Sequence, residues 1–213
     1  MVKNLSRLVC FGDSITQAWA FSYQDAWPAR LQRGLQDKGS RILVYNRGVS
    51  GDTTVQALDR FDVSIRPHLP AWVLISFGMN DSNVRVGRKT ARVGVEEYSR
   101  NLAEILRMIR AEGGEGIFLC LYAPSVAKQS TLKAEKASRI QHMAVYTAYR
   151  KAMISLARKE GCPLIDIPAG LKAVGKTTSN LLHPDGVHLS VEGNHLLARL
   201  ILPTLLKTIY RVQ

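Results

Sequence analysis

The 213-residue sequence contains no apolar run that approaches about 18 residues, the length that a helix needs to cross a bilayer. It has only three cysteines, Cys10, Cys120 and Cys162, and their odd number and wide spacing argue against a disulfide framework or a metal site. We expect buried, reduced thiols at Cys10 and Cys120, which stand inside apolar runs. Repeats, low-complexity segments and linkers are also lacking, so we expect one domain over residues 1–213, long enough to bury its own core.

The first residues lack the pattern of an export signal. A basic segment, a long apolar stretch and a small-residue cleavage site are all missing, and residues 1–4 (MVKN) lead almost directly into an apolar run at residues 7–11. We therefore expect a cytoplasmic protein.

Acidic residues are scarce: 17 Asp and Glu stand against 29 Lys and Arg, which gives a formal net charge of +12. Basic residues are concentrated in two stretches. The first contains Arg85, Arg88, Lys89 and Arg92, and the second contains Lys128, Lys133, Lys136 and Arg139. Neither stretch has interleaved aromatic residues for stacking on bases, and no zinc-finger or RNA-recognition motif is present, so nucleic-acid binding is disfavoured. Solvated loops and helix faces are the simplest interpretation. If these stretches rimmed an active site, they would favour anionic substrates.

Apolar segments rich in β-forming residues alternate with segments of helical periodicity. We expect strands at residues 8–11, 42–45, 72–77, 117–122 and 164–167. We expect helices at residues 24–37, 53–61, 93–111, 134–159 and 191–210, with Ser190 capping the last. Because the strands are continuously apolar, both of their faces should be covered, as in a parallel sheet between two helical layers. The sequence thus predicts a three-layer α/β/α sandwich of the flavodoxin-like type, with five parallel strands in the order 2-1-3-4-5.

Four short blocks follow the first, second, third and fifth expected strands. They are residues 11–14 (FGDS), 48–52 (GVSGD), 78–81 (GMND) and 185–188 (DGVH). In an open parallel sheet, ligands bind beyond the carboxyl ends of the strands. Blocks that are far apart in the sequence are therefore expected to converge at one edge of the sheet.

The first and last blocks supply the groups that nucleophilic catalysis needs. Ser14 is the candidate nucleophile, and His188 is the candidate base because Asp185 stands three residues before it. At that spacing the carboxylate can accept a hydrogen bond from the imidazole and fix the tautomer that faces the serine. His183 is the alternative base, whereas His195, inside the last expected helix, is expected to be structural.

The other blocks supply hydrogen-bond donors for an oxyanion. Three donors are candidates: the backbone amides of Ser14 and Gly51 and the side-chain amide of Asn80. Ser50 is a rival nucleophile, but it lacks the Gly-x-Ser-x-Gly spacing of a nucleophile elbow because position 52 is Asp. Asp13 and Asp81 are expected to accept hydrogen bonds that hold their loops.

These blocks resemble the motifs of the GDSL (SGNH) hydrolase family, whose four named residues are Ser, Gly, Asn and His. The matching positions are Ser14 in GDSI, Gly51 in SGDT, Asn80 in GMND and His188 in DGVH, with Ile15 in place of the family's usual Leu. The likeness runs from residue 11 to about residue 202. Residues 26–28 (AWP) and 70–74 (PAWVL) are similar to the bacterial thioesterase and lysophospholipase branch.

The resemblance implies that Ser14 is the nucleophile, that His188 is the base and that Asp185 is the carboxylate that orients the base. It implies an oxyanion hole made by the Ser14 and Gly51 amides and the Asn80 side chain. It also implies that the reaction uses no metal and no organic cofactor.

The resemblance leaves the substrate open, because family members cleave lipid esters, aryl esters, thioesters and sugar acetates with much the same core. The leading interpretation is a serine hydrolase of small or medium-sized carboxylic esters, with selectivity in the loops at residues 82–92 and 123–139. An acyl-CoA thioesterase or lysophospholipase and a sugar O-acetylesterase are alternatives. A flavodoxin-like module that binds a flavin or nucleotide is a different class. In such a module Asp13 would repel phosphate, and Asn80 and the Asp185–His188 pair would have no role.

Overall fold

The computed structural model describes residues 5–18, 22–85, 87–124 and 133–210, with the backbone alone described for residues 133–141. Five strands form one parallel sheet in the order β2-β1-β3-β4-β5, which confirms the predicted order. The strands are β1 (Arg7–Gly12), β2 (Leu43–Gly48), β3 (Trp72–Ser76), β4 (Glu115–Cys120) and β5 (Leu164–Asp166). Residues 1–4 and the side chains of the second basic stretch, residues 128–139, lie outside the described part of the chain.

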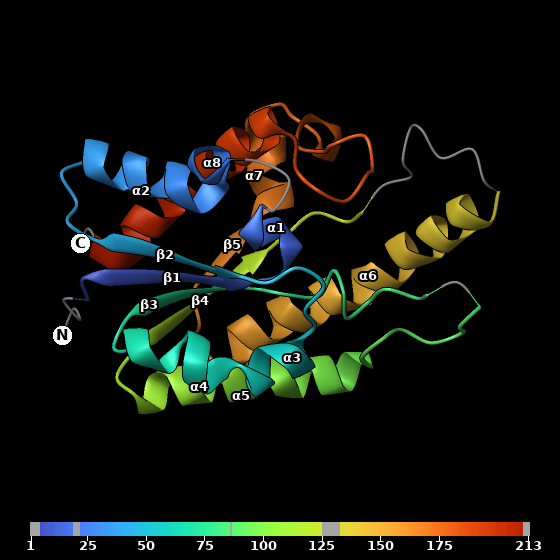
Figure 1. The fold of residues 1–213 in the computed structure, drawn as a ribbon, viewed down its shortest axis with the longest axis horizontal. Coiled ribbons are helices and arrows are strands. Elements are labelled where there is room, and N and C mark those ends of the chain that lie inside the picture. Colours follow the sequence, from blue (N-terminus) through green and yellow to red (C-terminus); the bar gives the residue numbers. More distant parts are fainter. Residues whose placement is uncertain (1–4, 19–21, 86, 125–132, 211–213) are drawn as a thin grey trace.

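Helices cover both faces of the sheet, as the continuously apolar strands predict (Figure 1). One face carries α2 (Trp27–Asp37), α7 (Ile167–Ala173) and α8 (Val191–Tyr210). The other carries α3 (Thr54–Asp59), α4 (Phe61–Ser64), α5 (Val95–Ala111) and α6 (Lys133–Lys159). The predicted three-layer α/β architecture is therefore confirmed, and no helix of the described residues is both long and apolar enough to span a membrane.

The central strand β1 shows how the sequence produces these layers. Leu8 and Cys10 pack in the core cluster shared with α2 and α8, whereas Val9 and Phe11 pack in the cluster shared with α5 and α6. Successive side chains of a strand point to opposite faces, so a strand between two helical layers needs apolar residues at every position. The three cysteines are buried free thiols, which agrees with the prediction for Cys10 and Cys120.

Two expected helices are shortened or divided. The helix expected at residues 24–37 begins only at Trp27, after a 3₁₀ turn at Tyr23–Asp25 and an extended Ala26. Pro28 explains this start, because in a continuous helix its ring would clash with the carbonyl group four residues earlier. The helix expected at residues 53–61 is divided at Arg60, whose φ of −100° and ψ of 6° separate α3 from α4.

The ends of the sheet also differ from expectation. β2 runs to Gly48 rather than ending at residue 45. It is an edge strand with one neighbour, so polar residues are tolerated near its end. The last strand ends at Asp166, whose side chain accepts from the Ala169 amide at 3.2 Å and caps the unexpected helix α7. At α8 the expected cap is present, with the Gly193 amide donating to Ser190 Oγ at 2.9 Å.

Candidate active site

The polar blocks meet where β1, β2 and β3 end in register. Gly12 pairs with Gly48 of β2 and with Ser76 of β3. Ser14 follows as the first residue of the short helix α1 (Ser14–Gln17). Asp13 caps this helix, accepting from the Ile15 amide at 3.0 Å, and so has the loop-holding contact expected of it.

Ser14, His188 and Asp185 form a continuous hydrogen-bonded chain, although 174 positions separate the serine from the histidine. Ser14 Oγ lies 3.0 Å from His188 Nε2, and His188 Nδ1 lies 2.7 Å from Asp185 Oδ2. Because an ionised carboxylate only accepts hydrogen bonds, Nδ1 carries the imidazole proton and Nε2 is left to accept from the serine hydroxyl. This arrangement can take the serine proton while the oxygen attacks a carbonyl carbon.

The loop that presents His188 is fixed by its own hydrogen bonds. Asp185 Oδ1 accepts from the Val187 amide at 2.8 Å and from the His188 amide at 2.9 Å. Burial alone would raise the pKa of Asp185, but these amides and the His188 ring outweigh it and lower the pKa. The Tyr122 hydroxyl donates to the Val187 carbonyl at 2.9 Å and ties the loop to the end of β4. Asp185 is therefore ionised at neutral pH and held against the imidazole.

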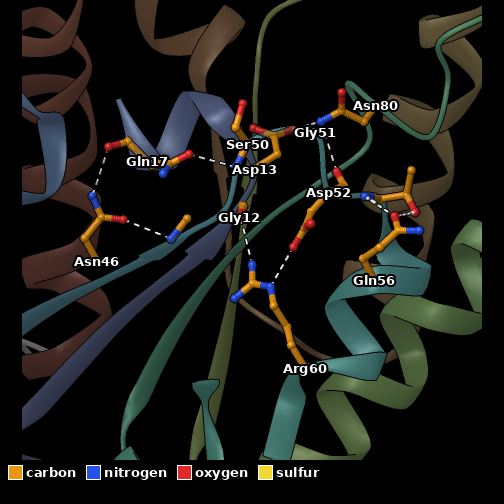
Figure 2. Close-up of polar contacts among 12 residues, drawn as sticks. Gly12, Asp13, Gln17, Asn46, Ser50, Gly51, Asp52, Gln56, Arg60 and Asn80 are labelled. Carbon is orange, nitrogen blue, oxygen red and sulfur yellow. Dashed lines mark hydrogen bonds and ion pairs between the residues drawn. The ribbon is translucent and has the colours of Figure 1, made fainter. Parts of the chain in front are cut away.

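Asn80 lies next to Asp13 and Asp52 beyond the end of β3 (Figure 2). Its Nδ2 donates to the Asp52 carbonyl at 3.0 Å and to the Asp13 carboxylate at 3.3 Å. These two contacts join Asn80 to the residues that directly adjoin Ser14 and Gly51 in the chain. Gly51 has a φ of +82°, a left-handed conformation that favours glycine.

Arg60 joins two of these blocks, although no motif in its local sequence indicates this role. Its Nε contacts Asp52 Oδ2 at 2.6 Å and its Nη2 donates to the Gly12 carbonyl at 3.1 Å (Figure 2). The guanidinium also lies 4.7 Å from the centre of the Phe11 ring. Arg60 thus connects the end of β1, just before Ser14, to the turn that contains Gly51. The only sequence signal was an arginine near the end of the helix expected at residues 53–61.

The end of the sheet buries carboxyl groups close to one another. Burial raises the pKa of Asp13 to about 7, the Ile15 amide opposes the rise, and the charges of Asp81 and Asp52 add to it. Burial also raises the pKa of Asp81, although its Oδ1 accepts from the Thr54 amide at 2.9 Å and from the Thr54 hydroxyl at 2.6 Å. Asp81 thereby has the loop-holding contacts predicted for it.

The described contacts do not link the rival candidates into a similar chain. Ser50 has its amide bound to Gln17 Oε1 at 2.8 Å (Figure 2), and no described hydrogen bond joins its hydroxyl to a histidine. His183 Nδ1 is 3.7 Å from Asp185 Oδ2, farther than His188. His195 faces Asp25, 3.6 Å away, on α8. Within the described part of the chain, no group of three or more His, Cys, Asp or Glu residues is placed to hold a metal ion.

Comparison with known proteins places a chain with this fold among enzymes of the ester-hydrolysing class. The chain belongs to the GDSL-like lipase/acylhydrolase family, whose model matches residues 10–196. The resemblance inferred from the motifs is therefore confirmed, and the flavin- or nucleotide-binding alternative is set aside.

Several relatives are named as esterases. The isoamyl acetate-hydrolyzing esterase 1 homolog of Mus musculus is 32% identical over 219 aligned residues, which cover 95% of this chain and 82% of the mouse protein. Esterase TesA of Pseudomonas aeruginosa is 26% identical, over 93% of this chain and 87% of its own. The thioesterase 1/protease 1/lysophospholipase L1 of Escherichia coli is 30% identical over 118 residues, 55% of this chain and 52% of its own. A crystal structure of TesA superimposes with a TM-score of 0.72 at 26% identity, covering 95% of this chain and 99% of that one.

Proposed function

We infer that the protein hydrolyses carboxylic esters through an acyl-enzyme on Ser14. The observation that carries this proposal is the contact chain from Ser14 Oγ to His188 Nε2, at 3.0 Å, and from His188 Nδ1 to Asp185 Oδ2, at 2.7 Å. In the first step Ser14 Oγ bonds to the ester carbonyl carbon and its proton passes to His188 Nε2. The imidazolium then protonates the departing alkoxide, and the acyl group remains on Ser14. Asp185 keeps its charge and stabilises the imidazolium throughout.

The second step uses the same groups in the same order. His188 takes a proton from water, the resulting oxygen nucleophile attacks the acyl carbon, and the proton returns to Ser14 Oγ as the carboxylic acid leaves. Each attack places negative charge on the carbonyl oxygen. The Ser14 and Gly51 amides and the Asn80 side chain are the donors that we assign to that oxygen. Asn80 Nδ2 makes two hydrogen bonds, and the one to the Asp13 carboxylate is the longer, at 3.3 Å. The oxyanion would take the place of this carboxylate as the acceptor.

We propose small or medium-sized esters as the substrates. The chain covers most of the length of relatives named for isoamyl acetate hydrolysis, which supports a short acyl group or a short alcohol. Ser14 would attack a thioester with the same help from His188 and Asp185, and the partial match to a protein named thioesterase 1 supports this second substrate class.

The proposal is tested with 4-nitrophenyl esters from acetate to palmitate. Ser14→Ala should lower kcat by about 10³-fold or more, as loss of a triad nucleophile does, and should abolish labelling by a fluorophosphonate. Ser50→Ala is the matched control, since it removes the rival hydroxyl from a neighbouring turn, and it should keep activity and labelling. Full activity in Ser14→Ala, or loss of labelling in Ser50→Ala alone, would overturn the assignment of the nucleophile.

A further inference from the structure

A loop with three arginines returns to the proposed active site. We call residues 82–92 the arginine loop; residue 86 lies outside the described residues. The Arg92 amide donates to the Asn83 carbonyl at 3.1 Å, and the Val93 amide donates to the Asp81 carbonyl at 3.1 Å. These bonds close the loop at its base, directly after Asn80. The position of the loop is therefore set by the same segment that holds a proposed oxyanion donor.

The arginine loop and the start of α3 line an open pocket of about 460 Å³. The lining comes from two segments, with Thr53, Val55 and Gln56 at the start of α3 and Arg85, Arg88 and Arg92 in the arginine loop. A volume of this size falls within the range of about 300–1,000 Å³ that small-molecule sites occupy.

The lining of the pocket is positively charged. Its described lining contains no Asp or Glu, and none of the three arginines makes an ion pair with a described residue. Burial, and next the positive charge of Arg85, lower the pKa of Arg92, against the pull of the Asp81 and Asp52 carboxylates. An anion in the pocket would offset the repulsion between these guanidinium groups.

The pocket also borders the proposed site of reaction. Arg92 Nη1 donates to the Gly51 carbonyl at 3.0 Å. Thr53, which also lines the pocket, stands two positions after Gly51. A group held in the pocket would therefore lie beside the turn whose amide we assign to the oxyanion.

We propose that this pocket is a subsite for an anionic group of the substrate, a carboxylate or a phosphate that lies away from the scissile bond. The inference rests on the proposed function and adds to it the charge of the substrate. Arg85 and Arg88 select the charged substrate, whereas Arg92 both contributes charge and holds the Gly51 turn. Two chemistries present such an anion: a carboxylate on a small ester, and the phosphates of an acyl-CoA.

The test compares two pairs of substrates that differ in charge. The first pair is 4-nitrophenyl hemisuccinate and 4-nitrophenyl methyl succinate, and the second is butanoyl-CoA and S-butanoylpantetheine. The double variant Arg85→Gln/Arg88→Gln removes two charges from the pocket and leaves the Arg92 contact intact. Lys38→Gln/Arg41→Gln is the matched control, because both of its residues are exposed and precede β2 at the opposite edge of the sheet.

The pocket variant should lower kcat/KM by about 10-fold or more for the charged member of at least one pair, through KM, as loss of charge-assisted contacts predicts. The uncharged members should change by less than about twofold, and the control variant should leave every ratio unchanged. The affected pair identifies the anion as a carboxylate or as the phosphates of coenzyme A. Equal losses within both pairs, or no loss, would overturn the subsite while leaving Ser14-dependent hydrolysis of uncharged esters in place. Absence of Ser14-dependent hydrolysis for all four substrates would overturn the proposed function and the subsite together.

Discussion

Asp185 uses its two carboxylate oxygens for different tasks. One oxygen accepts the Val187 and His188 amides and shapes the loop, while the other accepts from the imidazole at 2.7 Å. A single side chain therefore determines both where His188 lies and which of its nitrogens carries the proton. The spacing of the two residues predicted the contact with the imidazole, but the contacts with the amides depend on the turn that the loop adopts.

Replacing Asp185 with Asn separates these two tasks. In Asp185→Asn the amide oxygen can still accept the backbone N–H groups, but an NH₂ group would face His188 Nδ1 and favour the wrong tautomer. We expect kcat to fall by up to about 10⁴-fold, with little change in the melting temperature. Steady-state kinetics and thermal denaturation would measure the two effects. A loss of activity below tenfold would show that the imidazole does not depend on this carboxylate.

Asn80 donates to the proposed oxyanion through its side chain, whereas the other two proposed donors are backbone amides. A substitution can therefore remove the Asn80 donor alone. Asn80→Ala should lower kcat by about 10²–10³-fold and leave KM nearly unchanged, because the lost contact forms mainly in the transition state. Asn83→Ala, at the base of the arginine loop, is the control for general disturbance of this segment. Equal losses in the two variants would assign Asn80 a structural role only.

At the scale of elements, the site depends on contacts between turns that local sequence does not reveal. The strands were predictable, since burial on both faces demands continuous apolar runs such as residues 8–11. Helix α7 was not, because its signal is limited to Asp166 as a cap and Pro168 in the first turn. The role of Arg60 was not predictable either, because its partners at Gly12 and Asp52 are brought together only by the parallel pairing of β1 with β2.

Arg60 should therefore affect turnover as well as stability. In Arg60→Met we expect the melting temperature to fall and kcat to fall by about tenfold or more, because the turns that carry Ser14 and Gly51 lose their shared contact and the partly buried Asp52 loses its partner. Arg60→Lys should recover part of kcat by restoring the charge.

Arg66→Met is the matched control for this experiment. Arg66 makes exposed ion pairs with Asp62 and Glu112, which contribute about 0–1 kcal/mol. It should leave kcat unchanged. If both variants lost stability with no change in kcat, Arg60 would have no part in positioning the proposed site.

At the scale of the whole molecule, the buried carboxyl groups link stability to pH. The pKa of Asp13 is about 7 in the folded protein against an ordinary value of 3.8, so between these values the folded state keeps a proton that the unfolded state has released. The free energy of unfolding must then decrease as pH rises through this interval. The raised pKa of Asp81 acts in the same direction.

Urea denaturation at pH 4.5 and pH 8 would measure this linkage. In Asp13→Asn the decrease in the free energy of unfolding between the two pH values should be smaller than in the wild type, because the group that titrates is gone. Asp37→Asn, at the exposed end of α2, should retain the wild-type decrease. An unchanged decrease in Asp13→Asn would show that Asp13 does not carry the linkage.

The distance along the chain between Ser14 and His188 has a consequence for how the protein is made. A nascent chain that has formed β1 and presented its serine still lacks the histidine, which is synthesised 174 positions later. Every strand of the sheet precedes that histidine in the chain. Catalytic competence should therefore appear only after residue 188 has been synthesised, and recovery of activity after dilution from denaturant should require the segments of Ser14 and His188 to have docked. Hydrolysis would then serve as a built-in reporter that two segments 174 positions apart have met.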